Sequence, residues 1–423
     1  MTPKQAIPYG RRSVPLDLET AAGVTWIHPN DVPGADDPTQ EIQAALAAPL
    51  AEYAIPPYGD ARSVAIAIND KTRPVPHDLL LPPLLAHLAA RGYPPEAITF
   101  LIATGTHTPM PPSTHPQVVH PRILDRYTVV SHDCDAEDLV DLGTTERGTP
   151  VRVNRRFAEA DLRIAVGNVE PHHFAGFSGG VKSAAIGLAG RETITTNHAH
   201  LMDPRAALAR FADNPLRQDI EEIGRRMAID AALNVVMNRH KAIVKAWFGP
   251  PRAVIEAAMP EVRRIYEVPV AQPFDVMITS PGGYPKDINL YQAHKAVSCA
   301  NRVTREGGTI ILVAACEDGV GSEGYARYMD RGFDSHEAVM AQFVQESFRI
   351  GPHKAYIFGR DAVTLDSIWI VSGIDSERVR RLLLTPGSLR RAVRERVAPL
   401  PASARVGVMP YANATIPILD AHG

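Results

Sequence analysis

The stretch EPHHFAGFSGGVKS, residues 170–183, gathers residue types that do chemistry. From Gly176 it differs at one position from the phosphate-binding loop G-x-x-x-x-G-K-[ST], because Val181 stands where that loop has its second glycine. The backbone of such a loop passes close to the phosphates, and a β-branched side chain suits that path poorly. What remains is a glycine-rich turn that presents Lys182. A lysine held among apolar neighbours can lose its proton and act as a nucleophile or covalent anchor.

Histidines suited to proton transfer or metal binding lie on both sides of Lys182. His107 follows an apolar run in ATGTHTP, and His172 and His173 precede the glycine turn. An imidazole in such a loop exchanges protons near neutral pH. His198, sixteen residues after Lys182 in TITTNHAHL, offers a neutral ring nitrogen to a metal. No H-E-x-x-H motif or carboxylate-rich cluster accompanies it, so a metal held by the protein alone would lack ligands.

Two further segments carry residues suited to an anionic substrate. NDKTRPVP contains Asp70 and Arg73, and the planar guanidinium of an arginine binds a carboxylate or phosphate. In PGGYPKDINLYQAHKA, Tyr291 and Lys295 are four residues apart on one face of a predicted helix, with Gln292 beside them. Each segment alone is also compatible with a strand-exit turn or a solvated helix surface.

Short apolar runs alternate with helical patterns along the chain, which predicts an α/β fold. Asp70, His107 and His172 each follow a predicted strand. Because ligands of open α/β sheets bind at the carboxyl ends of strands, these three strand ends predict one site. We expect strands at 62–68, 98–103, 127–131, 161–167, 233–238 and 241–249, and helices at 79–92, 215–228 and 249–267.

A chain of 423 residues is expected to form two domains. The alternation of strands and helices restarts near VPVAQP, which sets the expected boundary at residue 268. We therefore predict an N-terminal cofactor-binding α/β domain over 1–267 and a C-terminal α/β domain over 268–403. Both are expected to contain mixed α/β sheets, and the active site is expected in the cleft between them. The terminal segment 404–423 is a candidate to cross back to the first domain.

Composition excludes several classes of protein. A formal net charge of −3 gives no basic footprint for nucleic acid. No apolar stretch approaches the roughly 20 residues that span a bilayer, and the N-terminus lacks the apolar core of a secretion signal. Cys134, Cys299 and Cys316 are too few and too scattered for a disulfide framework or a C-x-x-C metal site. The expected location is the reducing cytoplasm.

Taken together, these motifs resemble the nickel-dependent lactate racemase family. The resemblance rests on NDKTRP, ATGTH, EPHxFAGFSGGxK, the NH pair sixteen residues past the lysine, and YQAxK, in that order over residues 70–295. It implies a two-domain fold and the racemisation or epimerisation of 2-hydroxy acids. The segment SAAIGLAG after Lys182 lacks the proline of the family's P-G-x-A-G, a departure that removes no functional group.

The resemblance also implies a cofactor. Lys182 corresponds to the lysine that covalently carries a nickel-pincer nucleotide, pyridinium-3-thioamide-5-thiocarboxylic acid mononucleotide. His198 corresponds to the histidine that completes the coordination of nickel, and the other three donors come from the cofactor. Partner enzymes must build this cofactor and load it. Further residues expected around it are Asp70, Thr104, Gly105, Ser178, Gly179 and Gly180.

In the implied reaction, hydride leaves C2 of the hydroxy acid while a base takes the hydroxyl proton, because the C2 hydrogen itself is barely acidic. Return of hydride to the other face of the planar keto acid inverts the centre. His107 and His172 correspond to the two bases, and His172 is preferred to His173 by its ten-residue distance from Lys182. The residues that correspond to substrate contacts are Arg73, Tyr291, Gln292 and Lys295.

Two other functions stay open at this point. A P-loop-like phosphotransferase or NTPase would leave His107, His172 and His198 without a role. A non-catalytic protein that holds the cofactor or a hydroxy acid would not need a pair of proton-transfer histidines. Exchange of the C2 hydrogen between enantiomers separates a racemase from a binder, and magnesium-dependent nucleotide turnover would support the NTPase.

Overall fold

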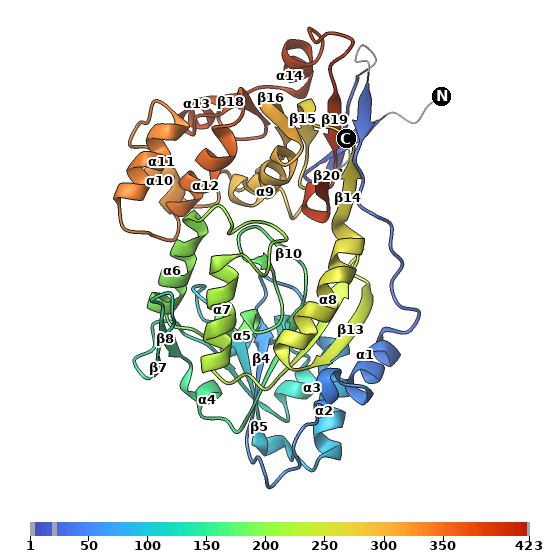
Figure 1. Cartoon of the computed structure of the whole chain (residues 1–423), viewed down its shortest axis with the longest axis vertical. Helices are drawn as coiled ribbons and strands as arrows, with labels where there is room; N and C mark the ends of the chain where they lie inside the picture. The colour runs from blue at the N-terminus through green and yellow to red at the C-terminus, as the bar shows by residue number, and fades with distance from the viewer. Residues whose placement is uncertain (1–4, 19–22, 421–423) are drawn as a thin grey trace. The chain divides into compact units, whose positions relative to one another are not determined.

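The structure is a computed structural model that describes residues 5–18 and 23–420 (Figure 1). The chain forms two compact units. The N-unit is Asp31–Arg264, and the C-unit combines Met1–Asn30 with Ile265–Gly423. Each unit has its own six-stranded sheet with helices packed on it, so the predicted α/β class is confirmed. The placement of the site in a cleft stays a prediction.

The N-unit sheet has the order β13-β12-β9-β4-β5-β6. Neighbouring strands are parallel except β12 and β13, which form an antiparallel pair. The chain fills the sheet outward from β4 through β5 to β6, and on the other side from β9 through β12 to β13. The winding therefore reverses between β4 and β9, and ligands of such sheets bind at the carboxyl ends of strands beside this switch point. The strands are β4 (Val64–Asn69), β5 (Ile98–Ala103), β6 (Thr128–Ser131), β9 (Leu162–Asn168), β12 (Ala231–Met237) and β13 (Ile243–Gly249).

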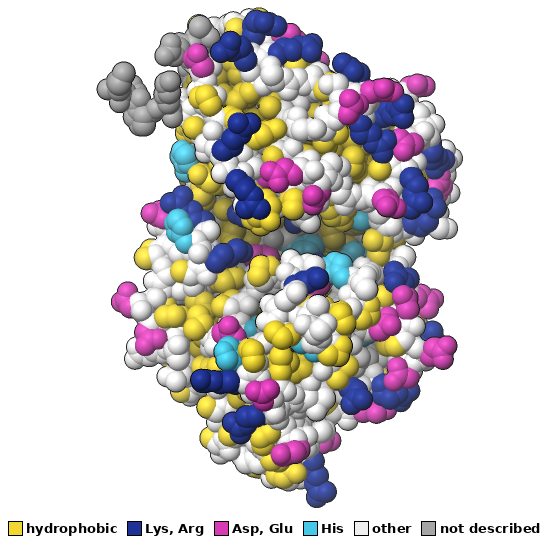
Figure 2. Space-filling model, turned by 180° about the vertical axis from the view of Figure 1, so that it is seen from behind, with side chains coloured by type: hydrophobic (Ala, Val, Ile, Leu, Met, Phe, Trp, Pro, Cys, Tyr) yellow, Lys and Arg dark blue, Asp and Glu magenta, His cyan; other side chains and the backbone are white. Residues whose placement is uncertain are grey.

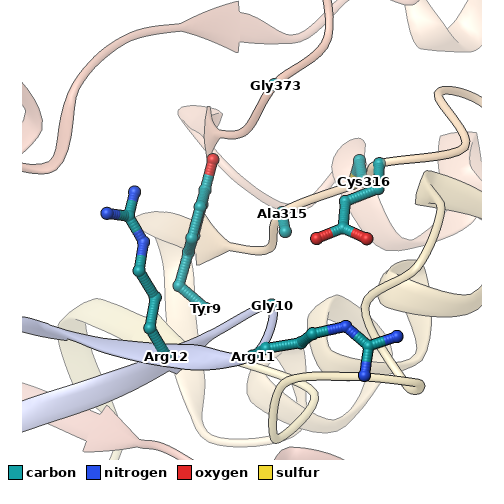
Figure 3. A pocket seen from close by; sticks show the side chains of 8 residues that line it. Tyr9, Gly10, Arg11, Arg12, Ala315, Cys316 and Gly373 are labelled. Carbon is teal, nitrogen blue, oxygen red and sulfur yellow. The ribbon is translucent and has the colours of Figure 1, made fainter.

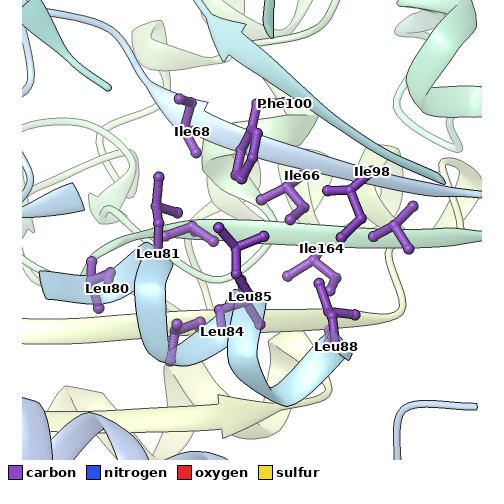
Figure 4. Close-up of a cluster of buried hydrophobic side chains, with 14 of the residues drawn as sticks. Ile66, Ile68, Leu80, Leu81, Leu84, Leu85, Leu88, Ile98, Phe100 and Ile164 are labelled. Atoms are coloured by element: carbon purple, nitrogen blue, oxygen red, sulfur yellow. The ribbon is translucent and has the colours of Figure 1, made fainter. Parts of the chain in front are cut away.

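Apolar packing holds this sheet in place. Every residue of β4 is buried, as the run VAIAIN predicts for a central strand of a parallel sheet. Helix α2 (His77–Ala90) packs Leu81 and Leu84 into the same cluster as Ile66 and Phe100 (Figure 4). Burying one such side chain contributes about 1.5–3 kcal/mol, so the strand ends that carry the candidate residues are rigidly supported.

Smaller elements complete the N-unit. Two short antiparallel pairs lie outside the main sheet, and one of them leads into the glycine turn before Lys182. These strands are β7 (Val140–Thr144), β8 (Pro150–Val153), β10 (Pro171–His172) and β11 (Gly176–Phe177). The other helices are α1 (Pro38–Ala47), α3 (Pro121–Leu124), α4 (Arg155–Ala158), α5 (Lys182–Ala185), α6 (Arg191–Ala199), α7 (Pro215–Arg226) and α8 (Pro251–Tyr266).

The C-unit sheet has the order β18-β17-β16-β15-β19-β3, and all its neighbouring strands are parallel. Its winding reverses between β15 and β19. The candidate helix α9 (Leu290–Asn301) follows the carboxyl end of β15. The sheet strands are β3 (Val24–Trp26), β15 (Phe274–Thr279), β16 (Thr304–Val313), β17 (Ser367–Val371), β18 (Thr385–Pro386) and β19 (Val406–Met409).

The remaining C-unit elements break the expected alternation. KAYIFG lies in a helix, so three helices follow one another between β16 and β17. Those three are α10 (Glu323–Met329), α11 (His336–Gln345) and α12 (His353–Ala362), and α13 (Ser376–Arg381) and α14 (Leu389–Arg396) come later. The other strands are β1 (Ala6–Tyr9) and β2 (Arg12–Pro15), which form a hairpin, and β14 (Glu267–Val270) and β20 (Ile416–Leu419), which pair in parallel.

Two expected domain limits are wrong. The first thirty residues belong to the C-unit, where β3 forms the edge of the sheet beside β19. The segment 404–420 does not cross back to the N-unit, because β19 pairs with both β15 and β3 of the C-unit. The second crossing of the chain lies between Arg264 and Ile265, three residues before the expected end of the first domain.

The described surface is consistent with the small net charge. On the face shown in Figure 2, basic and acidic side chains are interspersed without a large expanse of one sign. None of the described helices combines the length and the apolar character needed to cross a membrane.

Candidate functional site

The glycine turn before Lys182 is shaped by close packing. Gly179 and Gly180 have φ of +75° and +59°, the left-handed region that favours glycine. A Cβ on Gly179 would lie 2.6 Å from Val169 Cγ2, so no other residue fits there without displacing the chain. The amide of Gly180 donates to Asn234 Oδ1 over 2.7 Å. The turn is thereby fixed to the end of β9 and to the middle of β12.

A buried arginine that the sequence patterns do not single out clamps the same turn. Arg217 of α7 is fully buried and donates from Nη1 to the Phe177 carbonyl over 2.7 Å and from Nη2 to the Gly179 carbonyl over 3.1 Å. Its charge is balanced by Glu221, 2.7 Å away. The four-residue spacing of Arg217 and Glu221 on a helix was the available signal, but it reads equally well as a solvated surface pair.

Lys182 itself lies in an environment that favours the neutral amine. Its side chain is 2% exposed at the start of α5. Burial, and next the charges of Arg73 and Arg217, hold the pKa of Lys182 well below its usual value, while Glu170 opposes the shift. A neutral lysine amine is a nucleophile, which agrees with the role expected from the sequence. The shift also shows that Arg73 lies within electrostatic range of Lys182.

Val181 explains why this turn differs from a P-loop. Its side chain is 5% exposed and packs on α7 at Gly224, where an added Cβ would lie 2.4 Å from Val181 Cβ. In addition, the β10–β11 hairpin intervenes between strand β9 and Lys182, whereas a P-loop runs directly from strand to helix. The valine is therefore part of the core packing between the turn and α7.

We expect the substitution Val181→Gly to destabilise the protein, although it restores the full P-loop signature. The loss of a buried side chain and the added backbone freedom of glycine are expected to lower the free energy of unfolding by roughly 2–4 kcal/mol. Urea unfolding measures the change, with an assay of magnesium-dependent ATP hydrolysis beside it. A stable variant that gains nucleotide hydrolysis would restore the P-loop interpretation.

His107 and Asp70 form a hydrogen-bonded pair at the ends of β5 and β4. His107 Nδ1 lies 2.8 Å from Asp70 Oδ2, and the histidine side chain is 50% exposed while the carboxylate is 4% exposed. Thr72 Oγ1 donates to the other oxygen, Oδ1, over 2.7 Å. Although burial alone raises it, the pKa of Asp70 is lowered on balance by the bonds from His107 and Thr72. With Nδ1 donating to the carboxylate, Nε2 of His107 is left to accept a proton.

The partners of the Asp70 carboxylate in this geometry are therefore His107 and Thr72. In a protein loaded with the cofactor that the resemblance implies, we expect Asp70→Asn to lower kcat about 10- to 100-fold, because an amide neither fixes the tautomer nor balances a protonated ring. KM and covalent loading are expected to stay near wild type, as measured by steady-state kinetics and intact mass. A rise in KM with unchanged kcat would instead indicate that Asp70 contacts substrate.

Phe174 connects the other two candidate histidines. Its ring packs edge-on against His172, with ring centres 4.7 Å apart, and against His198, with centres 5.3 Å apart. The amide of Ala175 donates to His172 Nδ1 over 3.2 Å. One aromatic ring thus positions the predicted proton-transfer residue and the predicted nickel ligand, a role that the sequence patterns gave no reason to expect.

The two residues of the NH motif, Asn197 and His198, make different contacts. Asn197 is fully buried and donates to Asp219 Oδ2 over 2.8 Å and to the Leu216 carbonyl over 3.2 Å, which fixes α6 to α7. His198 follows it on α6 and contacts Phe174, whereas His200 lies 4.0 Å from Asp219. The two histidines therefore have different neighbours.

The remaining residues predicted to contact the cofactor make hydrogen bonds within the loops that carry them. Thr104 Oγ1 donates to the His132 carbonyl over 2.7 Å. Ser178 Oγ accepts from the Glu170 amide over 2.9 Å and also bonds the Asn168 carbonyl. Gly105, with φ of +56°, donates its amide to the Gly187 carbonyl over 2.9 Å and ties the ATGTH loop to the segment after Lys182. Their contacts with a cofactor stay predictions.

The predicted substrate residues are distributed over both units. Arg73 lies in the N-unit, and Tyr291, Gln292 and Lys295 lie on the first turns of α9 in the C-unit. The Asn289 side chain caps this helix by accepting from the Gln292 amide over 3.0 Å. Within each unit, the candidate residues follow the carboxyl ends of strands beside the point where the winding reverses.

Cavities alone would not have located these residues. A cavity of about 400 Å³ in the C-unit is lined by none of them (Figure 3). A second cavity, of about 320 Å³, borders Asp70 and the loop that follows it. The residues that line the first cavity are Tyr9, Gly10, Arg11, Arg12, Ala315, Cys316, Glu317 and Gly373.

Comparison with known proteins adds an independent observation. The model of the lactate racemase N-terminal domain matches residues 9–209, and that of the lactate racemase C-terminal domain matches residues 270–410. A lactate racemase from Lactiplantibacillus plantarum is 31% identical over 385 residues, which cover 86% of this chain and 89% of the relative. The chain belongs to the lactate racemase family. The enzyme class expected from the motifs, a racemase and hence an isomerase, is confirmed.

Other members of the lactate racemase family agree over nearly the whole chain. A lactate racemase from Thermoanaerobacterium thermosaccharolyticum is 29% identical over 388 residues, which cover 90% of this chain and 91% of the relative. The solved structure of the lactate racemase apoprotein from the same organism matches with a TM-score of 0.88 at 28% identity, covering 97% and 99% of the two chains. The family's N-terminal model begins at residue 9, although residues 9–30 fold with the C-unit.

Proposed function

We propose that the protein interconverts the enantiomers of a 2-hydroxy acid, lactate or a related acid, with a nickel-pincer nucleotide attached to Lys182. The observation that carries this proposal is the buried Lys182, whose amine is held towards its neutral form at the glycine turn beside Arg73. A covalent anchor for a nucleotide needs a nucleophilic amine, and the two lactate racemases to which the chain is similar indicate the reaction.

The residues present fit such a group. Ser183 Oγ, one residue after Lys182, is buried and has no hydrogen-bond partner within the described part of the chain, so a polar atom is available beside the anchor. Gly179 and Gly180 have no side chains, so a bound group could approach the backbone of the turn just before Lys182. His198 would supply a ring nitrogen to nickel, which accepts imidazole ligands. When bound, the group accepts and returns the hydrogen at substrate C2.

The protein's own residues divide the proton chemistry between two histidines. His107 accepts the substrate hydroxyl proton at Nε2, because its Nδ1 is turned to the Asp70 carboxylate. In the neutral ring of His172, Nδ1 accepts a hydrogen bond from the Ala175 amide, so Nε2 carries the ring proton and donates a hydrogen bond to the same substrate oxygen; His107 returns the proton to that oxygen once C2 has inverted. The guanidinium of Arg73 is suited to the substrate carboxylate, and Tyr291, Gln292 and Lys295 of the C-unit stay predicted substrate contacts.

Observations in the N-unit weigh against the two alternatives. The packing of Val181 on Gly224 and the hairpin before Lys182 leave no path like that of a P-loop. A non-catalytic binder has no use for a carboxylate dedicated to His107. The proposal also includes enzymes that build and load the cofactor, and a cytoplasmic location in which Cys134, Cys299 and Cys316 stay reduced; all three are free and buried.

Isotope tracing tests the proposed reaction. The loaded enzyme is incubated in ordinary water with lactate that carries deuterium at C2, and the product of opposite configuration is analysed by chiral chromatography and mass spectrometry. Inversion with retention of the deuterium is expected, because the same hydrogen leaves and returns. Inversion with loss of the label would point to deprotonation at C2, and absence of interconversion for any 2-hydroxy acid would overturn the proposal.

A further inference from the structure

A cavity of about 400 Å³ lies close to the carboxyl ends of two parallel strands of the C-unit, β16 and β17 (Figure 3). Its walls come from the β1–β2 hairpin and from the residues that follow these two strands. Ligands of open α/β sheets bind at such strand ends, and cavities of this size hold small molecules. The hairpin, which was expected in the other domain, therefore forms one side of a candidate ligand site.

A buried carboxylate holds the cavity walls together. Asp287 is fully buried, and its Oδ2 accepts from the Gly10 amide over 2.6 Å and from the Ala315 amide over 3.0 Å. The Tyr284 amide also donates to the Gly10 carbonyl, over 2.9 Å. Oδ1 of Asp287 is buried without a hydrogen-bond partner in the described part of the chain. The walls are thus fixed, and the negative charge that ties them together is only partly balanced by hydrogen bonds.

The backbone is strained where it borders the cavity. Cys316, the third residue after β16, has φ of +52°, a left-handed conformation that a side chain makes unfavourable. It is held there because the Cys316 amide donates to the Asp287 carbonyl and the Gly319 amide donates to the Cys316 carbonyl, both over 2.8 Å. Residues held in such conformations by their surroundings are concentrated at functional sites. The strain at Cys316 agrees with a ligand site at this cavity.

Charged groups of both signs line the cavity without pairing with one another. The guanidinium of Arg11 lies 3.6 Å from the centre of the Tyr284 ring. That of Arg12 lies 5.5 Å from the centre of the Tyr9 ring, and the two arginine side chains extend in different directions from the hairpin turn (Figure 3). Among the described residues, neither guanidinium forms an ion pair, and neither does the Glu317 carboxylate. A guanidinium stacked on a ring keeps its N–H groups available for an anion.

Negative charge reaches the same cavity from two carboxylates. Oε1 of Glu317 would lie 3.4 Å from a Cβ added to Gly10, so this carboxylate is directed at the hairpin turn. Burial, and then surrounding charges that include Asp287 and Glu317, raise the pKa of Tyr9. The Tyr9 phenol therefore stays protonated and can donate to an anion. The cavity thus has groups that attract a negative charge and groups that attract a positive one.

We propose that this cavity binds a small zwitterion, an α-amino acid, with its carboxylate at the arginines of the hairpin and its ammonium at Glu317. Because the two guanidiniums balance the carboxylates of Asp287 and Glu317, a ligand with both charges and no net charge preserves that balance. A guanidinium binds a carboxylate through paired hydrogen bonds, and an ammonium donates to a carboxylate over a short distance. An anion without a cationic group would leave Glu317 unpaired. This inference does not depend on the proposed function.

Calorimetric titration of the full chain tests this inference. The standard L-α-amino acids are first screened by thermal shift, and the one that raises Tm most is titrated beside the 2-hydroxy acid of the same carbon skeleton. The amino acid is expected to bind about 10-fold more tightly or better, because only its ammonium pairs with Glu317. The double variant Arg11→Gln/Arg12→Gln and the variant Glu317→Gln are each expected to weaken its binding about 10- to 100-fold, the effect of a lost charge-assisted contact.

Matched controls come from α10. Arg327→Gln and Glu323→Gln break an exposed ion pair of the same unit and are expected to leave binding unchanged. Titration of the hydroxy acid into the arginine double variant corrects for binding at the predicted substrate residues. The proposal is overturned if no amino acid binds, if the hydroxy acid binds this cavity as tightly, or if the cavity variants bind the amino acid like wild type. Equal Tm values without ligand confirm that the variants are folded.

Discussion

Alanine in place of His107 or of His172 is expected to slow racemisation by about 100- to 10,000-fold, the range that a positioned proton-transfer group contributes. His107 has its carboxylate partner at 2.8 Å, and His172 is oriented by the Ala175 amide and the Phe174 ring. Neither is expected to anchor the cofactor. The covalent adduct and the nickel content should therefore stay near wild type, as measured by intact mass and metal analysis.

His173→Ala is the matched control for this prediction. His172 is the last residue of β10, whereas His173 begins the turn that follows, so the backbone directs their side chains differently. Only one of them is therefore expected to reach the substrate. If His173→Ala is the damaging change and His172→Ala is not, the assignment is shifted by one residue. If all three variants keep full activity, histidine proton transfer is not part of the reaction.

Lys182→Met is expected to abolish both the covalent adduct and racemisation, because Lys182 is the amine to which the cofactor is proposed to be attached. The same substitution should stabilise the protein without cofactor. Burial lowers the pKa of Lys182, so the folded protein resists a proton that the unfolded chain accepts. Replacing a buried, unfavourable charge site by an apolar side chain of similar length raises the free energy of unfolding by about 1–4 kcal/mol near neutral pH.

The pH dependence of this gain follows from the direction of the shift. Above the ordinary lysine pKa, both the folded and the unfolded chain hold a neutral amine, so Lys182 costs no stability. As the pH falls below that value, only the unfolded chain takes up the proton, and wild type loses stability relative to the variant until the lowered folded pKa is reached. The difference in Tm between Lys182→Met and wild type should therefore shrink as the pH rises towards 10.

An exposed lysine provides the control. Lys245 on β13 is exposed, and Lys245→Met is expected to change neither the adduct nor the pH dependence of Tm. An adduct that persists in Lys182→Met would overturn the anchor assignment. A variant that is less stable than wild type at every pH would contradict the environment inferred for the amine.

The central strands are predicted well because strands that are buried on both faces have continuous apolar sequences. β4, β5 and β9 lie within one or two residues of the predicted segments RSVAIAI, ITFLIA and DLRIAVG, and their parallel pairing brings Asp70 and His107 together from different parts of the chain. No comparable apolar run indicates that the first thirty residues belong to the C-unit. β3 has three residues, and its partner β19 is almost four hundred residues away. Such a pairing leaves no local pattern.

The candidate site shows the same division. Residues that react or bind metals, such as Lys182 and His198, stand out by type and spacing. The residues that position them do not stand out: Arg217 reads as part of an amphipathic helix, and Phe174 reads as an ordinary hydrophobic residue. Their importance depends on burial and on neighbours from other elements, which only the folded chain supplies.

The most direct measurement is the intact mass of the protein, produced in a host with the cofactor-building enzymes, together with its nickel content. The predicted result is a nucleotide-sized adduct that maps to Lys182 by peptide analysis. About one nickel per chain is expected with it, because each chain offers one anchor, Lys182, and one predicted ring ligand, His198. An unmodified, nickel-free chain from a host that loads another lactate racemase would contradict the proposal and return attention to nucleotide binding at the glycine turn.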